Sequence, residues 1–141
     1  MADVNGIFHL YRIHGWCEPS QHLASAAWVI YTPTGQVLSS GGVCLRPSSN
    51  SVAEYSVVIE LLRDSISHGV LSLEVHLDSQ LVVSQLNGSY RIRDSILLQI
   101  FLCVRLLESQ FENLTYIHVS IIFNQFADSY ANYMVRLAFV S

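Results

Sequence analysis

The stretch from Ala53 to Gly88 constrains this sequence most, because it places two acidic residues in two neighbouring elements. Glu54 opens a segment with apolar residues at helical spacing, which predicts a helix with Glu54 in its first turn. Residues 73–77 alternate between apolar and polar side chains, as a half-buried strand does, and Asp78 follows directly. Open α/β sheets place their sites at the carboxyl ends of strands, so we expect Glu54 and Asp78 to share one site.

The remaining segments predict an α/β fold with the order β-β-β-α-β-α-α-β-α. Expected strands cover residues 7–13, 26–31, 36–45, 71–77 and 114–119, with a polar loop over 17–22. The first expected helix runs from a cap at Asn50 or Ser51 to about residue 67, and the others cover residues 81–86, 96–111 and 127–137. An antiparallel three-strand meander followed by βαβ crossovers predicts a mixed five-stranded sheet with helices packed on it. The 141 residues suit a single domain over 1–141, with its core at about 7–134.

Composition favours a folded protein that stays inside the cell. Apolar residues make up 51% of the chain and charged residues 13%, and we see neither a signal peptide nor an apolar run of the ~20 residues that a membrane span needs. We therefore expect a cytoplasmic or nuclear protein without a membrane partner. The net charge of −4 is unfavourable for nucleic-acid binding, which would depend on local geometry, metal ions or a further segment.

Several apolar and sulfur-containing side chains are expected in the core. The three cysteines lie far apart and show no metal-site spacing, so we expect three reduced core thiols. We also expect Trp28 to be buried, and Ile96 to begin the inner face of the 96–111 helix. The cysteines are Cys17, Cys44 and Cys103.

Four short motifs occur in a fixed order along the chain. They are NSVAEY at 50–55, DSQLV at 78–82, QLNGSY at 85–90, and IHV at 117–119 followed by NQFAD at 124–128. Together with the order of elements they resemble the type 1 ribonuclease H domain. The greatest likeness is to the ribonuclease H domain of plant long-terminal-repeat (gypsy-like) retrotransposon polyproteins and to related plant ribonuclease H-like proteins.

This resemblance implies hydrolysis of the RNA strand of RNA–DNA hybrids with two divalent cations, Mg²⁺ or Mn²⁺. Hard cations prefer carboxylate ligands, of which the family supplies four. Glu54, Asp78 and Asp128 match three of these, and the resemblance implies that they are catalytic and bind metal. It also implies a nucleic-acid partner, and descent from a polyprotein with a reverse transcriptase.

The fourth carboxylate of the family lies in an F-D-G motif at the end of the first strand, where this chain reads Ile13-His14-Gly15. An imidazole cannot bridge two Mg²⁺ ions and adds no negative charge. His14 at this catalytic position therefore predicts impaired hydrolysis. The alternatives are a catalytically inactive ribonuclease H-like domain that binds nucleic acid or protein, and an interaction module unrelated to nucleic acids.

Polar residues near the acids are expected to contact the substrate, and each has a structural alternative. Asn50, Ser51, Gln80 and Asn124 are the candidates, since hydrogen bonds in the minor groove can read the 2′-hydroxyl of RNA. Asn50 or Ser51 could instead cap the helix that carries Glu54. Each acid, taken singly, also has a structural explanation. Glu54 could be stabilised by the N-terminus of its helix, Asp78 could be an N-cap, and Asp128 could be a solvated residue in the first turn of a helix.

Overall fold

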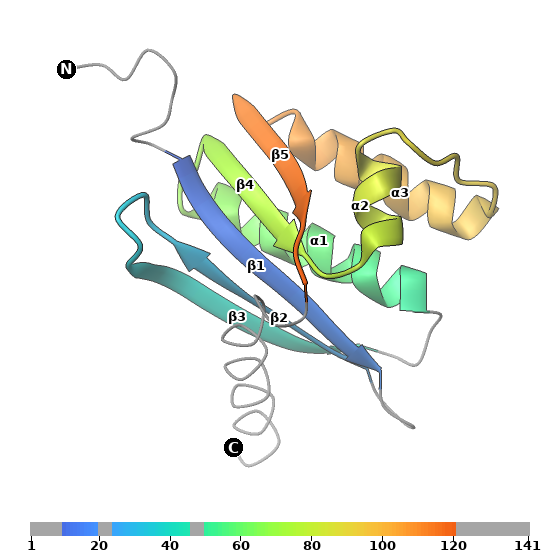
Figure 1. Cartoon of the computed structure of the whole chain (residues 1–141), viewed down its shortest axis with the longest axis horizontal. Helices are drawn as coiled ribbons and strands as arrows, with labels where there is room; N and C mark the ends of the chain where they lie inside the picture. The colour runs from blue at the N-terminus through green and yellow to red at the C-terminus, as the bar shows by residue number, and fades with distance from the viewer. Residues whose placement is uncertain (1–9, 20–23, 46–49, 121–141) are drawn as a thin grey trace.

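The computed structural model describes residues 10–19, 24–45 and 50–120 (Figure 1). The strands are β1 (Leu10–Pro19), β2 (Ala24–Tyr31), β3 (Val37–Leu45), β4 (Ser72–Leu77) and β5 (Asn113–His118). The helices are α1 (Asn50–Ser67), α2 (Gln80–Leu86) and α3 (Ser95–Glu108). No helix in these ranges combines the length and the apolar character needed to cross a membrane. The predicted helix at 127–137 and residues 7–9 of the first predicted strand lie outside the described residues.

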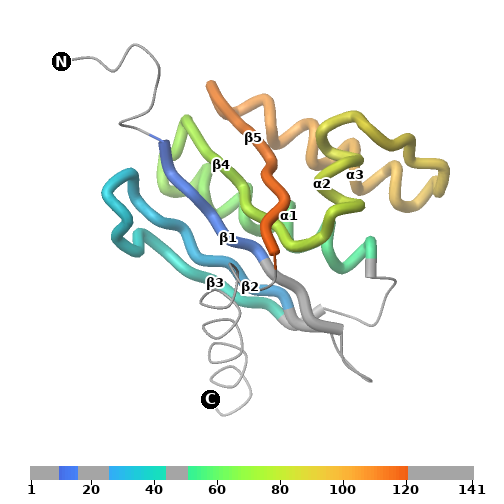
Figure 2. The backbone as a smooth tube through the Cα atoms, in the orientation of Figure 1, coloured from blue at the N-terminus to red at the C-terminus, as the bar shows by residue number. Residues whose placement is uncertain are grey.

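The sheet has the strand order β3-β2-β1-β4-β5. Strands β1, β2 and β3 pair in antiparallel fashion, whereas β4 pairs parallel to both β1 and β5. This arrangement confirms the predicted meander followed by crossovers. In the tube drawing, α1 runs behind the sheet, while α2 and α3 lie beyond its β5 edge (Figure 2).

The first strand is longer than the sequence predicted. β1 continues to Pro19, through part of the predicted loop at 17–22, because it forms a continuous antiparallel ladder with β2. This ladder satisfies backbone hydrogen-bonding groups that a loop would leave to solvent. His14 consequently lies inside a strand, between Val29 of β2 and His76 of β4, and not at a strand end.

Helix α1 packs closely on the sheet because Gly15 has no side chain. A Cβ atom at this position would lie 2.6 Å from Cδ2 of Leu61 and 3.2 Å from Cγ1 of Val57, both on α1. The surrounding side chains are fully buried. They include Ile13, Val58, Leu62, Leu73, Val75 and Leu77. The apolar residues that predicted α1 and β4 therefore form the contact between these two elements.

A second close contact joins β2 and β3 to the other end of α1. The indole N–H of Trp28 donates to Oδ2 of Asp64 at 2.8 Å, and the Ser39 hydroxyl donates to the same oxygen at 3.2 Å. Trp28 is only 7% exposed, which confirms its predicted burial. A Cβ atom at Gly41 would overlap the indole ring of Trp28, so the strand needs glycine there.

Two predictions about α3 are wrong. Ile96 is 64% exposed and Cys103 is also exposed, although both were expected in the core. Asp94 explains the position of Ile96, because its Oδ1 accepts hydrogen bonds from the backbone N–H groups of Ile96 and Leu97, both at 2.9 Å. This cap starts the helix with Leu97 facing inward and Ile96 facing outward. The side chains of Cys17 and Cys44 lie outside the described set.

The two closely packed glycines predict a ranking of stabilities. We expect Gly41→Ala to lower the free energy of unfolding by about 1–3 kcal/mol, because the rigid indole ring of Trp28 cannot move aside easily. Gly15→Ala should cost less, because the nearest atom is the flexible end of Leu61. Urea denaturation of both variants measures the difference. Equal stability of Gly41→Ala and the parent would contradict this account of the β2–β3 contact.

Candidate functional site

Glu54 and Asp78 come together from two different elements, as the sequence predicted. Asp78 directly follows β4 and precedes Ser79, whose side chain caps α2 by accepting from the backbone N–H of Val82 at 3.3 Å. Glu54 is carried by α1, which begins at Asn50, so Glu54 lies just past the first turn in which it was expected. Burial and, as the second cause, the charge of the neighbouring Asp78 raise the pKa of Glu54.

The Glu54 carboxyl group lies in an unfavourable setting for a charge. Burial is the main cause that raises the pKa of Glu54, and the charge of Asp78 is the second; together they raise it from 4.5 to about 8. Within the described part of the chain, the buried Oε2 atom of Glu54 has no hydrogen-bond partner. A buried oxygen without a partner is costly to maintain unless a proton or a cation compensates it.

These two carboxylates fit a hard divalent cation, but they do not complete its site. Carboxylate oxygens are the donors that Mg²⁺ and Mn²⁺ prefer, and Oε2 of Glu54 is without a hydrogen-bond partner in the described part of the chain. Across residues 10–19, 24–45 and 50–120, no group of three or more His, Cys, Asp and Glu side chains could hold a metal ion. Asp128, the predicted third carboxylate, lies outside the described residues, as does Asn124.

His14 lies in a ring cluster that we did not predict. Because side chains alternate along a strand and Gly15 faces α1, His14 projects from the other face of the sheet. Its ring centroid lies 4.6 Å from that of His76 and 5.6 Å from that of Tyr31. Nε2 of His76 lies 2.5 Å from Oε1 of Glu74, which in turn lies 3.6 Å from Nε of Arg12. The rings of His76 and Tyr31 therefore pack against an imidazole at the position where the resemblance predicts a carboxylate.

The sequence carried a signal for this cluster. Arg12 and His14 are two residues apart on β1, as Glu74 and His76 are on β4, so each pair lies on one face. The parallel register places Arg12 beside Glu74 and His14 beside His76. Only this register, which the local pattern does not contain, brings the two pairs together.

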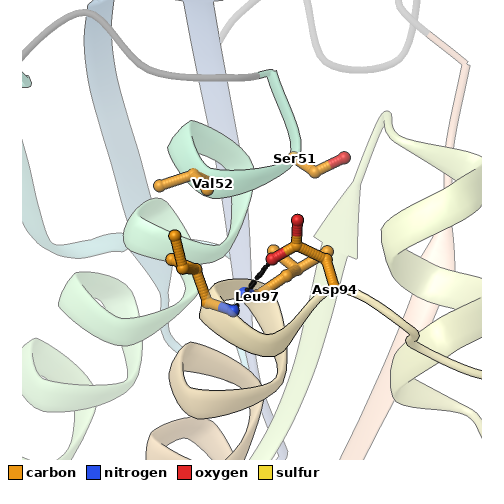
Figure 3. A pocket seen from close by; sticks show the side chains of 5 residues that line it. Ser51, Val52, Asp94 and Leu97 are labelled. Carbon is orange, nitrogen blue, oxygen red and sulfur yellow. Dashed lines mark hydrogen bonds between the residues drawn. The ribbon is translucent and has the colours of Figure 1, made fainter.

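Ser51 and Gln80, two of the predicted substrate-binding residues, line two different pockets. Asn50 and Ser51 form the start of α1, so they belong to the helix and do not cap it from outside. Ser51 lines a pocket between the N-termini of α1 and α3 together with Asp94 and Leu97, whose hydrogen bond is drawn in Figure 3. Gln80 is exposed at the start of α2 and lines a different pocket with Tyr90.

A partly buried polar network fixes α2, the helix that follows Asp78. The Tyr55 hydroxyl donates to Oε1 of Gln85 at 2.7 Å, which links α1 to α2. Arg105 on α3 donates from Nη2 to the carbonyl oxygen of Leu86 at 2.6 Å and from Nη1 to the Glu108 carboxylate at 2.8 Å. Burial raises the pKa of Tyr55 to about 12, so its hydroxyl remains a donor at neutral pH. This network was missed because its residues come from three separate helices.

Comparison with known proteins gives consistent matches. The sequence matches the family described as reverse transcriptase-like over residues 12–134. It is 30% identical over 92% of its length to ribonuclease HI of Halobacterium salinarum, covering 65% of that protein. It is 33% identical over 68% of its length to a bifunctional protein of Mycobacterium tuberculosis, covering 26% of it. The chain thus spans less than two thirds of the length of these relatives.

Solved structures with the same fold include those of both relatives. The crystal structure of RNase H1 from Halobacterium salinarum has a TM-score of 0.83 at 26% identity, over 90% of this chain and 98% of that one. The N-terminal RNase H domain of the mycobacterial protein has a TM-score of 0.83 at 28% identity, over 92% and 95%. LC11-RNase H1, solved with an RNA/DNA hybrid, shares the fold with a TM-score of 0.82 at 24% identity, over 92% and 99%.

The raised pKa of Glu54 predicts how stability depends on pH when divalent cations are absent. Between about pH 4.5 and 8 the folded state keeps a proton that the unfolded chain has released, so stability falls as the pH rises. Glu54→Gln removes this loss. We expect the variant to match the parent near pH 4.5 and to exceed its unfolding free energy by on the order of 2–4 kcal/mol near pH 8.5. Urea denaturation in EDTA measures the unfolding free energy of both proteins at each pH. If the two proteins show the same dependence on pH, the raised pKa of Glu54 is contradicted.

Proposed function

This chain belongs to the reverse transcriptase-like family and has the ribonuclease H fold, and on that premise we propose that it binds RNA–DNA hybrids and hydrolyses their RNA strand. The observation that carries the proposal is the pairing of Glu54 with Asp78 beside the carboxyl end of β4. Two ionised acids at this position are unfavourable for stability, because burial of Glu54 and the charge of Asp78 both oppose the ionisation of Glu54. Such a costly arrangement is typical of a functional site.

We assign cation binding to Glu54, Asp78 and Asp128. Bound Mg²⁺ or Mn²⁺ ions would supply an activated water and offset the charge of the phosphodiester. The chain's own contribution is to hold the acids in place: Ser79 caps α2 next to Asp78, and the Tyr55–Gln85 hydrogen bond ties α1 to α2. Both contacts fix the backbone that carries the acids before any cation arrives.

We assign hybrid recognition to Asn50, Ser51, Gln80 and Asn124. Gln80 supports this role because its side chain is exposed on the helix that begins after Asp78. Amide and hydroxyl groups can donate to and accept from the 2′-hydroxyl groups that distinguish RNA from DNA. The net charge of −4 offers no general attraction to the phosphate backbone, so these local contacts and the cations would have to provide it.

We expect hydrolysis to be slow because His14 occupies the position of a catalytic carboxylate. The family position is a carboxylate, and the imidazole adds no negative charge to the acidic pair. A second candidate function follows from the same residue: a domain that binds hybrids without cleaving them. The packing of His14 against His76 and Tyr31 favours this candidate, because these contacts fix the ring in a structural role.

The four motifs also bear on the organisation and origin of the chain. We propose a single domain over 1–141, located in the cytoplasm or nucleus, and descent from a plant retrotransposon polyprotein with a reverse transcriptase. The descent rests on the four motifs, among them the DSQLV segment that begins at Asp78. The relatives described above are archaeal and mycobacterial.

Cation binding should stabilise the folded protein whether or not the protein is catalytically active. At about pH 7.5, a divalent cation at ten times its dissociation constant should stabilise the parent protein by about 1.4 kcal/mol. Glu54→Gln should lose most of this gain, because one ligand is replaced by a neutral amide. Thermal unfolding with and without Mg²⁺ or Mn²⁺ measures the effect. Glu60→Gln is the control: it makes the same change on the same helix outside the acidic pair, and it should respond like the parent.

Hybrid cleavage tests the proposed activity. We expect the parent protein to cleave a labelled RNA–DNA hybrid slowly with Mn²⁺ or Mg²⁺, and Asp78→Asn to abolish cleavage. His14→Asp should raise the rate by about 100-fold, equivalent to about 2.7 kcal/mol of barrier, because it restores the missing carboxylate. If neither the parent nor His14→Asp exceeds Asp78→Asn, the nuclease proposal is wrong. Salt-sensitive hybrid binding without cleavage would then support the second candidate.

A further inference from the structure

Helix α3 carries an exposed row of leucines that neither the fold nor the acidic pair explains. Leu98, Leu102 and Leu106 are 40%, 53% and 73% exposed, respectively. Residues four apart lie on the same side of a helix, so these three side chains form one continuous surface, the outer α3 face. The buried side of the helix, with Leu97 and Val104, points in the opposite direction.

The outer α3 face has no charged side chain to keep it in water. The only charged residues of α3 are Arg105 and Glu108, which bind each other on the side of the helix next to α2. A surface helix normally carries charged and polar residues opposite its buried side, and a helix that is apolar on both sides is usually buried. A contiguous exposed apolar surface of this kind indicates a binding partner.

We propose that this partner is a second copy of the chain, packed against the outer α3 face in antiparallel orientation. The leucine spacing is symmetric about Leu102, as a two-fold axis requires. With the two-fold axis at Leu102, this residue contacts Leu102 of the second copy. Leu98 of each copy contacts Leu106 of the other.

Charges at the two ends of α3 complement each other in this orientation. Arg91 and Arg93 are exposed just before the helix, and Glu112 is exposed just after it. Among the described residues, none of the three forms a salt bridge. Antiparallel pairing brings the start of one α3 beside the end of the other, so the end with Arg91 and Arg93, which also carries the capping Asp94, lies near the Glu112 end of the second copy. Parallel pairing would instead bring like charges together.

The size of the surface predicts a weak dimer. A helix of 14 residues is about 21 Å long and about 10 Å wide with its side chains. Pairing along one such helix buries less than the roughly 800 Å² per partner of a standard stable interface. We therefore expect a dissociation constant in the micromolar range and a dimer that forms as concentration rises.

Analytical ultracentrifugation in reducing buffer tests this dimer directly. The parent chain should shift from monomer to dimer as its concentration rises, and Leu102→Glu should remain monomeric, because it places two carboxylates on the two-fold axis. Val37→Glu is the matched control: Val37 is 52% exposed against 53% for Leu102, and it lies on β3 at the opposite edge of the molecule (Figure 1). This control should still dimerise.

Cross-linking provides a second measurement that reports the orientation. The exposed Cys103 neighbours the proposed axis, so the two copies of this residue should lie within reach of a short bis-maleimide reagent. Mass spectrometry should find the Cys103 peptide linked to itself in the parent and not in Leu102→Glu. A parent chain that stays monomeric at all concentrations, or a dimer that survives Leu102→Glu unchanged, would overturn the proposal. Both measurements are independent of hybrid cleavage.

Discussion

The close packing of α1 on the sheet is the constraint on which the rest of the structure depends. The absence of a side chain at Gly15 lets Leu61 and Val57 of α1 approach β1 directly. Because β4 follows α1 in a parallel crossover, this contact also brings the beginning of the helix near the end of β4. Glu54 and Asp78 meet there. Their proximity is thus a consequence of core packing, which holds the two acids together although their negative charges repel each other.

The same packing creates an electrostatic cost. Glu54 is buried next to another carboxylate, and one of its oxygens lacks a partner within the described residues. Around this pair, in contrast, the polar groups are well satisfied: Tyr55 bonds to Gln85, and Arg105 bonds to Leu86 and Glu108. The described polar groups around the pair are hydrogen-bonded while Oε2 of Glu54 is not, and the proposed cation site rests on this contrast.

Local sequence patterns were sufficient for the framework but not for its details. Helical spacing and strand alternation predicted α1, α2, β4 and the meander, because these signals lie within single elements. The extent of β1 depended on pairing with β2, and the surroundings of His14 depended on the register with β4. The exposure of Ile96 depended on the Asp94 cap. Each of these is set by a particular partner, which periodicity alone does not specify. Asp128 and Asn124 stay predictions.

The central claim is that Glu54 titrates as a buried acid beside Asp78. A ¹³C NMR titration of the side-chain carboxyl groups in metal-free protein measures this most directly, with Glu54→Gln to assign the resonance. We predict a pKa near 8 for Glu54, moved toward ordinary values but not fully restored by Asp78→Asn, since burial is the larger cause. A pKa near 4.5 for Glu54, unchanged in Asp78→Asn, would contradict the account.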